Sequence, residues 1–104
     1  MESNVYPIQH FEMMRELATR VKAFPILILS HAYHYEAFGS WWFQFKRSGQ
    51  RYRIVFDGKD QKIRLETNIG DELKVEWGEI RIVDVLERDA ESTILLVCTL
   101  LETI

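Results

Sequence analysis

The stretch from Trp41 to Thr67 alternates between apolar and polar side chains with a period of two residues. Successive side chains of a β-strand point to opposite faces of a sheet, so this period is typical of strands with one buried face. The dipeptides Ser48-Gly49 and Asp57-Gly58 interrupt the alternation, and both are typical of tight hairpin turns. The stretch therefore predicts three consecutive antiparallel strands whose buried face carries Trp41, Phe43, Phe45, Tyr52, Ile54, Phe56, Ile63 and Leu65.

The segment before this meander has two different periods. From Ile8 to Ala23, apolar residues recur at spacings of three and four, which predicts an amphipathic helix. Pro7 suits its first turn and Pro25 ends it. The expected apolar stripe is Ile8, Phe11, Met14, Leu17, Ala18 and Val21. Residues 26–35 are rich in branched and aromatic side chains and predict a further strand, with one face made of Leu27, Leu29, His31, Tyr33 and Tyr35.

The last third of the chain contains a strand pattern followed by a helical one. Leu73, Val75 and Trp77 alternate, and residues 80–85 are β-branched enough for another strand. From Asp89, a suitable N-cap, apolar residues recur at helical spacing, although a strand paired with residues 80–87 is the alternative. We prefer the helix. The chain is thus expected to be a single α+β domain (1–104), with an N-terminal helix, an antiparallel meander of four to five strands, and a C-terminal helix packed on one sheet face.

Cysteine usage and the chain start suggest a compartment. Cys98 is the only cysteine, so no intramolecular disulfide can form, and it lies in an apolar stretch where an inert buried thiol is expected. The first residues lack the basic and apolar segments of a signal peptide. The strongly apolar run from Ile94 to Cys98 is far too short to cross a bilayer. We therefore expect a cytoplasmic protein.

Charge is unevenly distributed along a chain whose net charge is −3. Residues 46–65 carry seven basic and two acidic side chains, whereas residues 66–104 carry ten acidic and three basic ones. Strand alternation places much of the basic group on the side of the meander that faces away from the core. That side is expected to present Trp42, Gln44, Lys46, Arg51, Arg53, Lys62 and Arg64.

The leading hypothesis is a small non-catalytic interaction module of bacterial type that binds a protein partner through this face. Tryptophan and arginine are common anchors of protein interfaces, and the cationic residues favour an acidic partner. The proposed binding residues are Trp42, Lys46, Arg51, Arg53, Lys62 and Arg64. An immunity or antitoxin protein is one concrete version. The plain alternative is a face whose long side chains only shield the sheet from solvent.

Other partners follow from the same charge pattern. Phosphate backbones could bind the cationic face, with Trp42 stacking on a base, although the acidic chain as a whole argues against a nucleic-acid reader. The acidic segment could bind a basic partner through Glu72, Glu76, Glu79, Asp84, Glu87, Asp89 and Glu91. A homodimer that pairs the basic segment of one copy with the acidic segment of another is a third alternative.

An enzymatic alternative rests on three residues. Asp57 ends a predicted strand, and Glu72 and Lys74 share one face of a later one. This pattern looks like the metal-dependent nucleases of the PD-(D/E)xK type, although Phe56 stands where proline is usual. The resemblance implies that the two carboxylates hold Mg²⁺ and that the lysine stabilises the attacking water or the transition state.

Motifs for other chemistry are missing from the sequence. His34 and Glu36 share a strand face, with His31 on the opposite one, and three convergent metal ligands are not visible. We find no Ser/His/Asp pattern, glycine-rich phosphate loop or Cys/His metal spacing, and therefore expect no cofactor.

Overall fold

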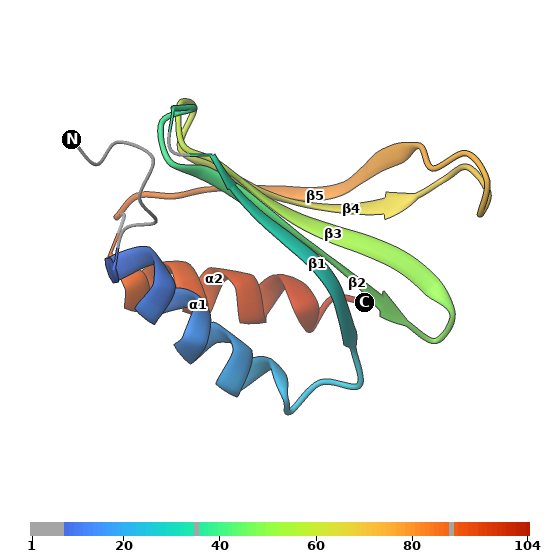
Figure 1. Ribbon diagram of the computed structural model, residues 1–104, viewed down its shortest axis with the longest axis horizontal. Helices are drawn as coiled ribbons and strands as arrows, with labels where there is room; N and C mark the ends of the chain where they lie inside the picture. Colours follow the sequence, from blue (N-terminus) through green and yellow to red (C-terminus); the bar gives the residue numbers. More distant parts are fainter. Residues whose placement is uncertain (1–7, 35, 88) are drawn as a thin grey trace.

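The chain forms two layers, an antiparallel sheet and a pair of helices that cover one of its faces (Figure 1). The computed structural model describes residues 8–34, 36–87 and 89–104. The expected α+β class, meander and terminal helices are confirmed. The elements in chain order are α1 (Ile8–Val21), β1 (Leu27–His34), β2 (Ser40–Arg47), β3 (Gln50–Asp57), β4 (Lys62–Asn68), β5 (Trp77–Asp84) and α2 (Ala90–Leu101).

The sheet is a meander in which every strand pairs with its neighbour along the chain, in the order β1-β2-β3-β4-β5. The register aligns the apolar positions of adjacent strands, since Phe43 pairs with Ile54 and Ile54 with Leu65. These side chains point toward the helices and form the core. The buried residues contributed by the sheet are Trp41, Phe43, Phe45, Ile54, Phe56, Ile63 and Leu65, as the alternation predicts, whereas Tyr52 of the predicted face is only partly buried.

Helix α2 confirms the helical interpretation of the C-terminal segment. The Asp89 carboxylate accepts a hydrogen bond from the backbone N–H of Ser92 at 2.8 Å, which satisfies one of the free donors of the first turn. A helix is favoured over a strand because one side of it can be buried completely against the sheet and α1. The buried residues of α2 are Thr93, Ile94, Val97, Leu100 and Leu101.

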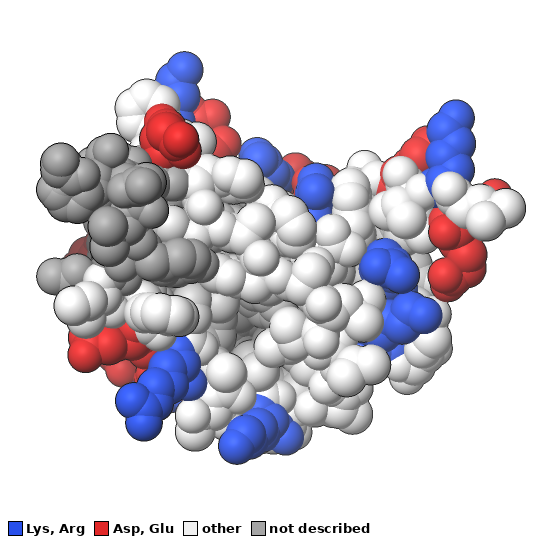
Figure 2. Space-filling model, viewed as in Figure 1, with Lys and Arg blue, Asp and Glu red and all other residues white. Residues whose placement is uncertain are grey.

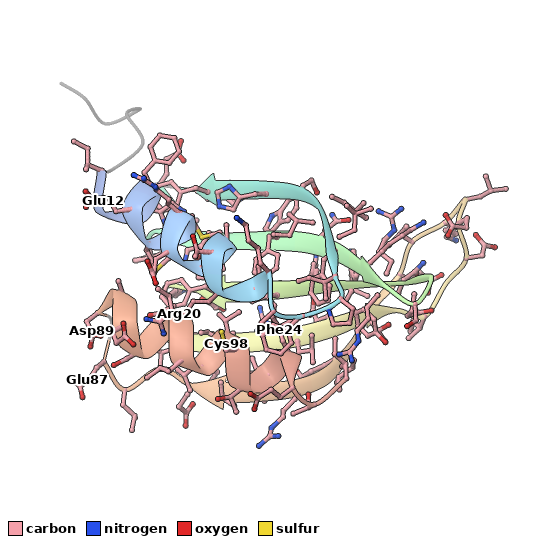
Figure 3. All side chains as sticks on the ribbon, turned by 90° about the horizontal axis from the view of Figure 1, so that it is seen from below. Glu12, Arg20, Phe24, Glu87, Asp89 and Cys98 are labelled. Atoms are coloured by element: carbon pink, nitrogen blue, oxygen red, sulfur yellow. The ribbon has the colours of Figure 1, made fainter. Side chains whose placement is uncertain are left out.

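Ion pairs and hydrogen bonds hold the helices to each other and to the sheet. The Arg20 guanidinium on α1 donates to both oxygens of Glu91 on α2, at 3.2 and 3.1 Å, and Figure 3 shows Arg20 between the two helices. These bonds, with another from Arg20 to Glu16, raise the pKa of Arg20. At the other end of α2, Arg47 of β2 donates to the carbonyl oxygen of Ile104 at 2.5 Å.

The buried stripe of α1 differs from the predicted one. Ile8 and Phe11 are 70% and 63% exposed, whereas Leu17 and Val21 lie in the core as expected. Among the side chains of α1 that the structure describes, the first buried one is His10. Apolar side chains occur on more than one side of this helix, so their spacing alone does not fix which side packs. The contacts with α2 and the sheet turn inward a stripe that begins at His10, one helical turn before Met14.

An irregularity in β1 divides the single face that the sequence predicts for this strand. The register shifts between Ile28 and Ser30, so that Leu29 is an extra residue in the pairing with β2. Leu27 consequently pairs opposite Lys46 on the side away from the helices, whereas His31 and Tyr33 pair opposite core residues. Tyr35, the last residue of the predicted face, lies outside the described residues.

The predicted strand pattern at Leu73 and Val75 is wrong, because this segment is a loop between β4 and β5. Two side chains organise it: Asn68 Oδ1 accepts from the N–H groups of Gly70 and Glu76, and Asp71 Oδ1 accepts from those of Leu73 and Lys74. Such bonds offer the backbone an alternative to strand pairing. Trp77, by contrast, is the first residue of β5, as the alternation predicts.

The helices of the described residues are short relative to a bilayer. Neither α1 nor α2 combines the length and the apolar character that a membrane-spanning helix requires.

Candidate interaction surface on the outer face of the sheet

The face of the sheet that points away from the helices is referred to here as the outer face. The pairing places all seven residues expected there on it: Trp42, Gln44, Lys46, Arg51, Arg53, Lys62 and Arg64. The same pairing adds Val55, Asp57, Glu66, Trp77, Glu79, Ile82 and Asp84, with a register shift between β4 and β5 that separates Glu79 from Ile82. Both helices lie on the opposite side of the sheet (Figure 1), so neither of them covers this face.

Carboxylates neutralise most of the basic side chains of the outer face. A row of four charged residues crosses β3 and β4. Arg53 Nε lies 2.5 Å from Glu66 Oε1, the second oxygen of Glu66 lies 3.8 Å from Arg64, and Arg64 lies 3.7 Å from Asp57. The Glu66 side chain is only 12% exposed, so these charges are partly removed from solvent. The row contains two cations and two anions and is neutral.

The remaining basic residues of the outer face lie around this row. Lys62 pairs with Asp84 of β5 at 2.5 Å, which raises the pKa of Lys62, and Lys46 lies 3.9 Å from Glu72 in the β4–β5 loop. Arg51 donates to the side-chain oxygen of Gln44 at 3.3 Å. The expected cationic face is therefore a surface of balanced charge, because acidic residues of β3, β4, β5 and the loop lie among the basic ones.

Two tryptophans contribute to the outer face. The Arg53 guanidinium lies over the ring of Trp77, 4.6 Å from its centroid, while its Nε binds Glu66. This combination of stacking and charge pairing fixes the orientation of the arginine. Trp42 lies half-buried between Ala32 and Val55 in the adjacent strands, whereas its neighbour Trp41 is buried in the core. On the helical side, the ring centroid of Trp41 lies 6.0 Å from that of His10 of α1, whereas Trp42 is left on the outer face.

The outer face is hollowed between two projecting ends. In the space-filling view of Figure 2, the upper outline dips between a projection on the left and one on the right. The left projection contains the turns at the ends of β1 and β3, and the right one the β4–β5 loop (Figure 1). The ion pair between Lys46 and Glu72 ties this loop to the outer face. At its tip, Leu73 is 99% exposed. The outer face therefore has an aromatic and charged floor between two raised ends, which carry charged as well as apolar side chains (Figure 2).

The three residues of the nuclease resemblance are not brought together. Asp57 is the last residue of β3 and pairs opposite Lys62, at the start of β4. Glu72 and Lys74 lie in the loop beyond the other end of β4, about 20 Å away along a strand of this length. In the described part of the chain, no group of three or more His, Cys, Asp or Glu side chains is arranged to hold a metal ion.

A pair of histidines on the helical side was not foreseen from the sequence. His10 of α1 and His31 of β1 have their Nε2 atoms 3.4 Å apart, and the ring of His10 packs on Tyr33 with centroids 4.1 Å apart. Burial and the neighbouring His31 lower the pKa of His10 to about 4, and burial also lowers the pKa of His31. His34 lies at the end of β1 opposite Ser40. Burial raises the pKa of the Cys98 thiol, as expected of an inert cysteine.

The two-residue alternation of the strands could have revealed the acidic residues that pair with the arginines of the outer face. Asp57 and Glu66 are separated from the basic residues of their own strands by even numbers of positions, so they lie on the same face. No comparable signal pointed to His10, whose burial depends on the packing of α1. In comparisons with protein-family models, curated proteins and solved structures, no match to this chain was found.

Proposed function

We propose that this chain is a protein-interaction module that binds a partner protein through the outer face of its sheet. The observation that carries the proposal is the fixed pair of Arg53 and Trp77 on a hollowed face that neither helix covers. Tryptophan and arginine dominate the energetics of protein interfaces when they are held in place before binding. Trp42, Val55 and Ile82 supply apolar area around this pair.

The charge balance favours a protein over a nucleic acid as the partner. A phosphate backbone binds by replacing counterions at free lysine and arginine side chains. Here Arg53, Lys62 and Arg64 already have carboxylate partners, and a phosphate would bring further negative charge close to them. A protein surface can instead pack on the tryptophans and hydrogen-bond to the edges of the neutral row. The partner need not be strongly acidic.

Removal of the Trp77 ring is expected to abolish partner capture without unfolding the chain. The Trp77→Ala variant loses the stacking surface of Arg53 and apolar contact area, and loss of such an anchor weakens binding by about 30-fold or more. The matched control is Leu95→Ala, which removes an exposed side chain from α2 on the opposite layer. Immobilised wild-type and variant chains are compared for the proteins that they retain from a lysate of the source organism, and circular dichroism verifies the fold.

Equal capture by the wild type and Trp77→Ala would contradict the proposal, as would a loss of capture confined to Leu95→Ala.

Titration of fluorescent DNA and RNA at low and high salt tests the nucleic-acid alternative. We expect no salt-sensitive binding at protein concentrations of up to about 100 µM, the upper end of the range of typical non-specific dissociation constants at physiological salt.

A further inference from the structure

We propose that His10 and His31 form a binding site for a borderline divalent metal ion, with Zn²⁺ as the best fit. The two imidazoles come from different elements, α1 and the edge strand β1, and their Nε2 atoms are 3.4 Å apart. The ring centroids are 5.5 Å apart, so the two nitrogens lie on the facing edges of the rings. The site lies in the helical layer and is independent of the outer face.

The separation of the nitrogens suits a tetrahedral metal. Two ligand nitrogens at 2.0–2.1 Å from Zn²⁺ in a tetrahedron lie about 3.3–3.4 Å apart, which is the spacing of His10 and His31. An ion can therefore replace the hydrogen bond that joins the two Nε2 atoms with little change in the distance between them. Imidazole is a preferred ligand of Zn²⁺, Ni²⁺ and Cu²⁺, whereas Mg²⁺ prefers oxygen.

The surroundings hold the His10 ring in place and leave His31 exposed. The His10 ring packs against Tyr33 and Trp41, with centroids 4.1 and 6.0 Å away, which fixes its orientation. His31 is exposed, so an ion has access to the pair from solvent. The bound ion would link α1 to β1.

The direct test is metal-dependent thermal stability of the full chain, prepared without a histidine tag and treated with a chelator. With Zn²⁺ in large excess over its dissociation constant, the midpoint of unfolding should rise by about 5–10 °C, because the ion binds only the folded pair. Mg²⁺ should produce no rise. The rise should disappear in His10→Gln and His31→Gln and persist in the control His34→Gln, which changes the third histidine of the chain.

A second measurement covers the case in which His10→Gln does not fold. In ¹⁵N-detected spectra of the wild-type imidazoles, Zn²⁺ should shift the Nε2 signals of His10 and His31 and leave those of His34 in place. The proposal would be overturned by an unchanged midpoint, by a rise that His31→Gln retains, or by a shift of the His34 signals alone.

Discussion

Replacement of Leu65 by alanine is expected to lower the free energy of unfolding by about 2–5 kcal/mol. Leu65 lies in β4, is 0% exposed, and pairs opposite Ile54 in the centre of the core between the sheet and the helices. The substitution removes buried apolar area and leaves a cavity that the rigid strands cannot fill. For a chain of 104 residues, the midpoint of thermal unfolding should fall by roughly 10–20 °C.

The matched control for this substitution is Leu73→Ala. Leu73 is 99% exposed at the tip of the β4–β5 loop, so the same chemical change removes no buried contact. We expect a change within about 0.5 kcal/mol. Urea unfolding followed by tryptophan fluorescence measures both variants. Equal destabilisation by Leu65→Ala and Leu73→Ala would contradict the assignment of the core to the helical side of the sheet.

Replacement of Gly58 by alanine is the second large effect that we expect, a loss of about 1–3 kcal/mol. A Cβ atom at this position would lie 2.0 Å from the backbone carbonyl oxygen of Phe38. The clash involves backbone, so rotation of a side chain cannot relieve it. Hydrogen bonds hold the two turns close together: the Gly58 N–H donates to Ser40 Oγ at 2.9 Å, and this hydroxyl donates to the Ala37 carbonyl oxygen.

Gly49 offers a control for the loss of a turn glycine. Its φ is +81°, and a Cβ atom there would have no neighbour within 4 Å. Asparagine tolerates this backbone conformation, so Gly49→Asn should cost less than about 1 kcal/mol. Gly58→Asn should be at least as damaging as Gly58→Ala. If chemical denaturation gives Gly58→Ala and Gly49→Asn the same small cost, the close packing of the two turns is wrong.

The fold was largely predictable because local pattern and tertiary packing agree in most elements. The alternation from Trp41 to Thr67 specifies both the strands and their buried faces, and Asp89 marks the start of α2. The sequence pattern was insufficient to predict features that depend on how two strands pair. The extra residue at Leu29 depends on the register with β2, and no periodicity within residues 26–35 reveals it.

The candidate surface was predictable in its location but not in its charge. The alternation along the strands placed Arg53 and Arg64 on the outer face correctly. The prediction of a cationic face considered only the basic residues, however, and overlooked Glu66, which forms ion pairs with both arginines. Lys46 pairs with Glu72, a residue 26 positions later in the chain, through a loop that was expected to be a strand. Such contacts depend on how the chain returns across the sheet, so residue spacing could not supply them.

The most direct test of the proposed interaction surface is site-specific photo-cross-linking in the source cells. A benzophenone amino acid replaces Val55, which lies between Trp42 and Arg64 on the outer face, or Leu95 on α2. Thermal unfolding verifies that each variant folds. The account predicts covalent adducts with a discrete partner protein from position 55 and none from position 95. Adducts from position 95 alone, or from neither position, would contradict it.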